Sequence, residues 1–234
     1  MRAIILAAGM GTRLRPLTND TPKALVKVNG KPMVERQIEF LLEKGIEDIL
    51  IVTGYLHEKF DYLKGKYGVK LVHNDKYDVY NNIYTMYLVK DQLPGSYILE
   101  GDVYLNNNVL DSAPSSSMYF CNFRESFTNE WKIVADSQNK VTNIIEGSGT
   151  DDYILSGISY WNEEDGRFIV EKLQEVMESD DFTELYWDEI VKRNIGQLHV
   201  VLRKMKPTDS FEIDNVEELR QVENILNGVK PVSV

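Results

Sequence analysis

The first thirty residues constrain the fold of this chain more than any other stretch. A short apolar run from Arg2 to Leu6 leads without a break into a loop that carries Gly9 and Gly11. Such a run predicts a buried strand that ends in a tight, glycine-bearing loop. Small residues in that loop let backbone N–H groups come close to a ligand, as in the concave backbone sites that bind anions.

Basic residues follow the glycines, at Arg13, Arg15 and Lys23, and they suit a polyphosphate ligand. A lone Gly-x-Gly fits equally well with a tight turn whose basic side chains face solvent. The chain as a whole carries a formal net charge of −11, which makes a local basic cluster more informative. The cluster therefore favours a phosphate-binding loop.

Two other phosphate-binding loops do not fit the spacing. A Walker loop ends in Gly-Lys-Ser/Thr, whereas Gly11 is followed by Thr12 and Arg13. A dinucleotide-binding Rossmann loop needs a small residue where Leu14 stands, and an acidic residue at the end of a second strand about twenty positions further on. Glu35 lies near that distance, but within a helical pattern.

Apolar runs alternate with helical patterns through the first half of the chain. Predicted strands cover 48–53, 70–73 and 96–99, and predicted helices cover 33–44, 57–66 and 83–93. This alternation predicts a parallel sheet with right-handed crossovers.

The second half has a different pattern. Strand-like segments cover 118–124, 131–135, 141–146, 154–161 and 198–203, and predicted helices cover 164–178, 187–193 and 215–226. With no linker or repeat, we expect one domain over residues 1–234, in two halves at 1–110 and 111–234. The expected fold class is α/β, a Rossmann-like, mostly parallel mixed sheet flanked by helices, with a small α+β lobe.

Composition excludes several classes of function. The acidic balance argues against binding to nucleic acid or to an anionic membrane, and no apolar run is long enough to span a bilayer. The single Cys121 forbids an internal disulfide, and Met1 leads straight into the first strand without room for a signal peptide. We therefore expect a cytoplasmic protein.

Asp102 follows the predicted strand that ends at Leu99, within Glu100-Gly101-Asp102. Ligands of open α/β sheets bind at the carboxyl ends of the strands, which is where a catalytic carboxylate belongs. An ordinary turn aspartate after Gly101 fits the spacing equally well.

The opening LAAGMGTRLRPLTNDTPKALVKVNGKPM resembles the signature of nucleotidyltransferases that join a nucleoside triphosphate to a phosphorylated small molecule. The resemblance implies that the loop holds the triphosphate, with Lys23 and Arg13 as catalytic cations. It also implies Mg²⁺ bound by the catalytic Asp102 and by Asp214, which precedes the last helix. The implied nucleotide-binding residues in this opening are Leu6, Ala7, Ala8, Gly9, Gly11, Thr12, Arg13 and Lys23.

Later segments narrow the resemblance to the bacterial choline-phosphate cytidylyltransferases of the LicC type, nearly end to end. The segments are KGIEDILIVTGYL, NDKYDVYNNIYTMYL, TNEWKIV, LSGISYW and LYWDEIV. The Glu100-Gly101-Asp102 segment departs from the more acidic strand end that this resemblance leads us to expect, so the geometry around Mg²⁺ is expected to differ slightly.

The acceptor implied by the resemblance carries a quaternary ammonium, which a protein holds with aromatic faces and nearby carboxylates. Any one of these aromatic residues could instead be an ordinary core residue. At least one of Trp161 and Trp187 is expected in the core, because adjacent strand residues face opposite ways. The candidate acceptor-binding residues are Glu130, Trp131, Tyr160, Trp161, Tyr186, Asp188 and Glu212.

For the nucleotide base the candidates are Tyr80, Asn81 and Asn82. An asparagine offers both a donor and an acceptor to a pyrimidine edge, and Tyr80 could stack on the ring. Alternatively, Asn81 or Asn82 caps the helix that follows.

Together these features predict a Mg²⁺-dependent cytidylyltransferase that converts CTP and phosphocholine to CDP-choline and pyrophosphate. Other acceptors stay open, namely phosphoethanolamine, 2-aminoethylphosphonate, another phosphorylated amine or amide, and a sugar 1-phosphate. A non-catalytic nucleotide sensor is a further alternative. The sequence leaves a homodimer open.

Overall fold

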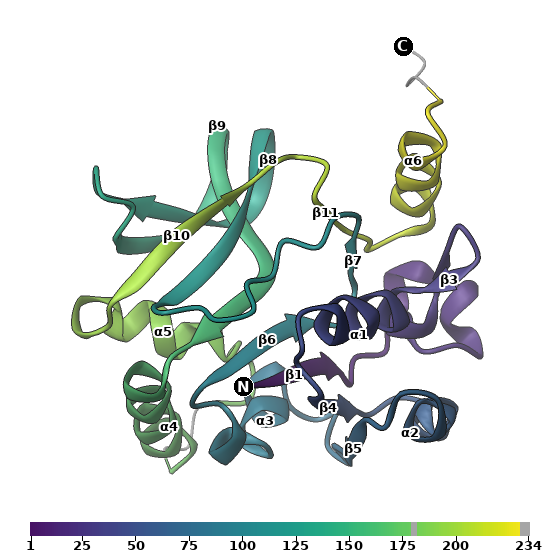
Figure 1. The fold of residues 1–234 in the computed structure, drawn as a ribbon, viewed down its shortest axis with the longest axis horizontal. Helices are drawn as coiled ribbons and strands as arrows, with labels where there is room; N and C mark the ends of the chain where they lie inside the picture. The colour runs from purple at the N-terminus through teal and green to yellow at the C-terminus, as the bar shows by residue number, and fades with distance from the viewer. Residues whose placement is uncertain (179–181, 230–234) are drawn as a thin grey trace.

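A computed structural model describes residues 1–178 and 182–229. A seven-stranded sheet runs through the molecule in the order β10-β8-β9-β6-β1-β4-β5 (Figure 1). Its strands are β1 (Arg2–Ala7), β4 (Asp48–Thr53), β5 (Lys70–His73), β6 (Ser96–Glu100), β8 (Ser117–Ala135), β9 (Val141–Trp161) and β10 (Val200–Met205).

The pairing is mostly parallel. Strand β1 lies parallel to β4 and β6, β4 to β5, and β10 to β8, whereas β9 runs antiparallel between β6 and β8. This confirms the expected mixed, mostly parallel sheet, and strands from both halves of the chain share it. Two small antiparallel pairs lie outside it, β2 (Lys27–Val28) with β3 (Lys31–Pro32) and β7 (Val103–Leu105) with β11 (Ser210–Glu212).

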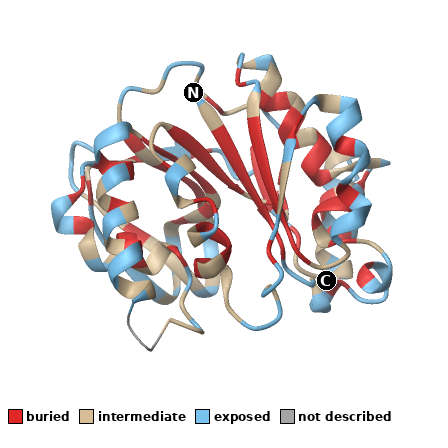
Figure 2. Ribbon diagram, turned by 90° about the horizontal axis from the view of Figure 1, so that it is seen from below, coloured by how far each residue is buried: buried red, intermediate tan, exposed pale blue. Residues whose placement is uncertain are grey.

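Helices flank both faces of the sheet, whose central strands are buried (Figure 2). The alternation along β1 sends Ile5 to one hydrophobic cluster and Ile4 to another, as expected for a strand buried on both faces. None of the described helices combines the length and the apolar character that a membrane span needs. The helices are α1 (Met33–Glu43), α2 (Tyr62–Tyr67), α3 (Asn82–Tyr87), α4 (Glu163–Met177), α5 (Asp188–Asn194) and α6 (Val216–Leu226).

The second half differs from the sequence-based expectation in one respect. The predicted strands 118–124 and 131–135 are one strand, β8, and 141–146 and 154–161 are one strand, β9. The register between them shifts at Phe127/Glu130 and at Trp131/Lys132, so irregular pairing, rather than a break in the strand, separates the predicted segments. Much of the arm between 124 and 150 is exposed or half-buried, and few of its side chains, Ile133, Val141 and Ile144, are buried, so its sequence pattern is weakly constrained.

Two predicted helices are shorter than expected. The segment 57–66 divides into a 3₁₀ turn at His57–Phe60 and helix α2. The segment 83–93 divides at Val89, where φ is −122°, into α3 and a 3₁₀ turn at Lys90–Gln92. Val89 is β-branched and therefore a weak helix former.

The backbone segments that follow β1 and β6 lie very close to each other. Leu6 is in register with Glu100, and the Gly101 backbone N–H donates to the Leu6 carbonyl at 2.8 Å. A Cβ atom at Gly101 would lie 2.9 Å from that oxygen, which explains the glycine. The loop after β1 and the turn after β6 therefore lie next to each other at the carboxyl ends of these two strands.

Trp161 is fully buried at the end of β9, where its ring meets Tyr119 and Trp187 edge-on and its indole N–H donates to Ser159. We expect Trp161→Ala to lower the free energy of unfolding by about 3–5 kcal/mol, because it opens a large cavity in the core. Urea denaturation measures this. Tyr186→Ala, at a side chain that is 51% exposed, is the control and should change stability by less than about 1 kcal/mol. Equal losses in the two variants would contradict the core assignment.

Candidate active site

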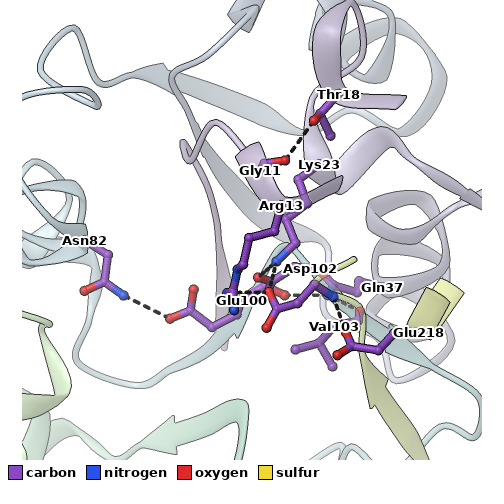
Figure 3. A network of polar contacts seen from close by, with 11 residues as sticks. Gly11, Arg13, Thr18, Lys23, Gln37, Asn82, Glu100, Asp102, Val103 and Glu218 are labelled. Atoms are coloured by element: carbon purple, nitrogen blue, oxygen red, sulfur yellow. Dashed lines mark hydrogen bonds and ion pairs between the residues drawn. The ribbon is translucent and has the colours of Figure 1, made fainter. Parts of the chain in front are cut away.

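The loop after β1 folds back on Lys23. Gly11 adopts a left-handed conformation with φ of 58°, and its carbonyl accepts hydrogen bonds from the Leu14 N–H and from Thr18 Oγ1 (Figure 3). A Cβ atom at Gly11 would lie 2.8 Å from the Lys23 Cβ, so only glycine lets the two segments approach this closely.

A small cavity of about 130 Å³ lies between this loop and the end of β6. It brings together several predicted nucleotide-binding residues, and Thr85, Glu100 and Gly101 complete its wall. Gly11 and Thr12 line neither this cavity nor the larger one described below. The predicted residues that line the small cavity are Leu6, Ala7, Ala8, Gly9, Lys23, Asn82 and Asp102.

The Lys23 ammonium lies between two carboxylates. Its Nζ is 2.5 Å from Asp102 Oδ2 and 2.6 Å from Asp214 Oδ1, and Arg13 Nη2 lies 2.8 Å from the same Asp214 oxygen. Burial alone would lower the pKa of Lys23, but the attraction of Asp102 and Asp214 outweighs it and raises the pKa above its ordinary value. Lys23 is therefore a fixed cation at the junction of three chain segments.

Local structure places the two aspartates. Asp102 lies in the turn between β6 and β7, and its carbonyl accepts from the Ile213 N–H at 3.3 Å. Asp214 lies between β11 and α6, where its N–H donates to Glu218 Oε2 at 2.7 Å and the Asn215 side chain caps the helix.

Asp102, Glu212 and Asp214 each offer a carboxylate oxygen, and these oxygens lie within 4.8 Å of one another. Hard oxygen ligands of this kind suit a divalent cation such as Mg²⁺. The sequence assigned Glu212 to the acceptor, whereas the geometry adds it to the group that could hold a metal ion.

A larger cavity of about 560 Å³ opens beside the carboxylate group. Seven carboxyl side chains and one guanidinium, Arg13, line it among the described residues, together with four aromatic rings. The carboxyl groups belong to Glu100, Asp102, Glu130, Glu146, Asp188, Glu212 and Asp214, and the rings to Tyr119, Trp131, Tyr186 and Trp187.

This acidic crowding shifts the titration of several side chains. Burial raises the pKa of Glu100 well above its usual range, and the charges of Asp102 and Asp188 raise it further. Burial raises the pKa of Asp188 to about 7, although the Tyr119 hydroxyl donates to it at 2.6 Å and lowers it in part. The pKa values of Glu130 and Glu212 are also raised, mainly by desolvation. The cavity therefore favours a positively charged ligand.

Two predicted acceptor residues lie elsewhere. Tyr160 packs on Tyr97 in one core cluster, with ring centroids 5.0 Å apart, and Trp161 lies in the other cluster. Helices cover both faces of the sheet, so the alternation along β9 sends both side chains into core rather than into the cavity. Both predictions are corrected to core residues, whereas Glu130, Trp131, Tyr186, Asp188 and Glu212 line the cavity.

The segment predicted to hold the base has mixed roles. Asn81 caps α3, since its Oδ1 accepts from the Asn82 N–H, and Tyr80 packs between Tyr84 and Phe182 without lining either cavity. Asn82 lines both cavities, and its amide accepts from the Trp187 N–H at 2.9 Å and donates to Glu100 Oε1 at 3.3 Å. Of the two asparagines that could cap the helix, Asn81 is therefore the one that does so.

Sequence reasoning missed several residues of the cavity wall, of which Glu100, Trp187 and Tyr119 bear most on its chemistry. Glu100 had a signal, because it immediately precedes Gly101 and Asp102 at the end of a strand. Trp187 was considered as a late aromatic candidate or a core residue, and it is both buried, at 2% exposed, and part of the cavity wall. Tyr119 had no signal, because its contact with Asp188 joins residues 69 positions apart.

Comparisons with known proteins agree with this geometry. Residues 2–114 match the family model described as nucleotidyl transferase. The chain is 51% identical to the choline-phosphate cytidylyltransferase of Streptococcus pneumoniae over 97% of this chain and 99% of that protein. It is 36% identical to the 2-aminoethylphosphonate cytidylyltransferase of Lancefieldella rimae over 93% of this chain and 89% of that protein.

A solved structure shows the same fold. The structure of CTP:phosphocholine cytidylyltransferase from Streptococcus pneumoniae superposes with a TM-score of 0.94 at 51% identity, covering 96% of this chain and 98% of that one.

The pKa of Asp188 predicts a pH-dependent stability. Between about pH 4 and pH 7 the folded protein keeps a proton on Asp188 that the unfolded chain has lost, so the contribution of this group to stability falls as pH rises. Asp188→Asn removes the effect. Its free energy of unfolding relative to the parent should rise by roughly 2–4 kcal/mol from pH 4 to pH 8, as measured by urea denaturation. The exposed Asp78→Asn variant should show no such change. A constant difference for Asp188→Asn would contradict the shifted pKa.

Proposed function

Because the chain belongs to the nucleotidyltransferase family, among the choline-phosphate cytidylyltransferases, we propose that it converts CTP and phosphocholine to CDP-choline and pyrophosphate. The observation that carries the proposal is the junction of two unlike cavities at Asn82, Glu100 and Asp102, which line both. The loop after β1 and Lys23 line the small cavity, Lys23 contacts Asp102, and the larger cavity is acidic and aromatic.

The larger cavity has the chemistry that a trimethylammonium group needs. Such a group donates no hydrogen bond, so aromatic faces and carboxylates are what hold it. Trp131 and Tyr186 meet edge-on with ring centroids 6.3 Å apart at this wall. The Trp131 ring already has a cation on it, since Lys192 Nζ lies 4.7 Å from its centroid.

In the proposed reaction a phosphocholine oxygen attacks the α-phosphorus of CTP in line, and pyrophosphate leaves without a covalent enzyme intermediate. The chain then contributes positioning and charge neutralisation. Lys23 stabilises the negative charge between the two phosphates, and Arg13 stabilises the leaving pyrophosphate.

Mg²⁺ would be held by Asp102 and Asp214, with Glu212 close enough to complete the group, and would neutralise phosphate charge at the reacting centre. The Lys23 ammonium contacts the same two aspartates. A divalent cation competes with it for these oxygens, which would free Lys23 to contact the phosphates.

We also propose that the two halves of the chain bind different substrates. Residues 1–110 supply the nucleotide side and residues 111–234 most of the acceptor side, although Arg13, Asn82 and Asp102 also line the larger cavity. A cytoplasmic location and a homodimer stay predictions from the sequence.

A second acceptor, 2-aminoethylphosphonate, has one observation in its favour, the 36% identity to a 2-aminoethylphosphonate cytidylyltransferase.

A panel of substrate pairs decides between the acceptors. Four nucleoside triphosphates are combined with phosphocholine, phosphoethanolamine, 2-aminoethylphosphonate and glucose 1-phosphate, and pyrophosphate release is measured. CTP with phosphocholine should give the highest kcat/KM, and a higher value for any other pair would overturn the proposal.

Trp131→Ala separates the two kinds of acceptor. We expect kcat/KM for phosphocholine to fall by about tenfold, because the cation–π contact is lost. The value for phosphoethanolamine, whose primary amine can use carboxylates, should stay within about twofold. The matched control is Tyr87→Ala, an aromatic ring that also carries a lysine, Lys90, at 4.4 Å but lines neither cavity. Equal losses for the two acceptors would argue against an aromatic contact with choline.

Lys23→Ala and Asp102→Ala test the catalytic assignment. Each should lower the rate of pyrophosphate release by more than about tenfold, since the loss of a key cation or metal ligand raises the barrier by several kcal/mol. Lys27→Ala, at an exposed lysine of the same segment, should leave the rate unchanged. A rate of pyrophosphate release within about tenfold of the parent, in either site variant, would contradict the catalytic assignment.

A further inference from the structure

Helix α1 has a glutamine in its buried, apolar face. Gln37 is fully buried beside Val34, Ile38 and Leu41. Burial of a primary amide is unfavourable unless the amide forms hydrogen bonds. Its partners therefore show what the side chain does at this position.

Both partners belong to the turn that carries Asp102. Gln37 Nε2 donates to the Glu100 carbonyl at 2.8 Å and to the Val103 carbonyl at 2.7 Å, on either side of Gly101 and Asp102 (Figure 3). Because both acceptors are carbonyl oxygens, only the NH₂ group can face them, which fixes the orientation of the amide. One side chain thus spans the whole turn.

Lys23 holds the Asp102 carboxylate directly, but the other backbone contacts of the turn each hold it at a single point. The Gly101 N–H donates to Leu6, and the Ile213 N–H reaches the Asp102 carbonyl at 3.3 Å. The neighbouring Arg36 holds the far end of β7 instead, through the Leu105 and Asn106 carbonyls.

The oxygen of the Gln37 amide is unfavourably placed. Its Oε1 is buried and has no hydrogen-bond partner among the described residues. A methionine would fill similar space without leaving that oxygen unpaired. Packing alone therefore does not explain a glutamine here, whereas the two bonds across the turn do.

We propose that Gln37 is a positioning residue for metal binding, which fixes the Glu100–Val103 turn so that the Asp102 carboxylate stays close to Glu212 and Asp214. This inference rests on the proposed function, because it takes Asp102 as a metal ligand. Partners that orient a metal ligand typically change metal affinity by about 10–100-fold when they are removed.

Gln37→Met tests the proposal, since it keeps the length of the side chain and removes both bonds. Uptake of Mn²⁺, which accepts the same oxygen ligands as Mg²⁺, is followed by electron paramagnetic resonance of the free ion. We expect the Kd for Mn²⁺ to rise about tenfold, and the Mg²⁺ concentration for half-maximal pyrophosphate release to rise with it. Arg36→Met, which loses two bonds to the same strand away from Asp102, should stay within about twofold of the parent.

The outcomes separate this inference from the proposed function. A parent protein that takes up no Mn²⁺, or an Asp102→Ala variant that binds it as tightly as the parent, would contradict the metal site itself. Loss of Mn²⁺ in Asp102→Ala together with a Kd within about twofold in folded Gln37→Met would overturn the role of Gln37 alone.

Gln37→Glu is the second variant if Gln37→Met does not fold, because it keeps the shape of the side chain and replaces the donating nitrogen by oxygen. The same two outcomes apply to it. If neither variant folds, the residue serves the stability of the fold and the positioning role is overturned.

Discussion

The Lys23 ammonium between Asp102 and Asp214 is the contact on which the site depends. It joins the loop after β1, the turn after β6 and the segment before α6, which are far apart in sequence. Within the described part of the chain, seven carboxyl groups line the adjacent cavity, and their mutual repulsion opposes a compact site. Desolvation is the main cause of the raised pKa values of Glu100, Asp188 and Glu212, and neighbouring carboxylates of the cavity raise the pKa values of Glu100 and Glu212 further. A cation that binds in this cavity is therefore stabilised by its attraction to the carboxylates.

This electrostatic pattern also fits a zwitterionic acceptor in one orientation. Arg13 and Lys23 contact the same Asp214 oxygen, and phosphate groups would be neutralised beside these two cations. Asp188 and Trp131 line the larger cavity and suit a positive group. An acceptor with a phosphate at one end and an ammonium at the other therefore matches the distribution of charge, and the reverse orientation would place like charges together.

The sequence was sufficient where local pattern decides the structure. Strands 48–53 and 70–73 have the predicted bounds, and the glycine-bearing loop, Lys23 and Asp102 meet at one edge of the sheet. It was insufficient where distant segments decide the environment. Tyr160 and Trp161 looked like cavity residues because of their chemistry, yet helices cover both faces of their strand. Gln37 reads as one polar position on an apolar helix face, and only its contacts with residues 63 and 66 positions away reveal a role.

The irregular pairing of β8 with β9 provides a physical route to a change of acceptor. Glu130 and Trp131 lie between register shifts in an arm that extends from the seven-stranded sheet. Such irregularities re-aim side chains locally, while the parallel strands that hold Lys23 and Asp102 keep their register. Substitutions in the arm can therefore alter the aromatic wall without disturbing the reacting centre. Under the proposed function, the reaction would then be fixed at the carboxyl ends of the central strands β1 and β6, and the acceptor by the partly exposed arm of β8 and β9.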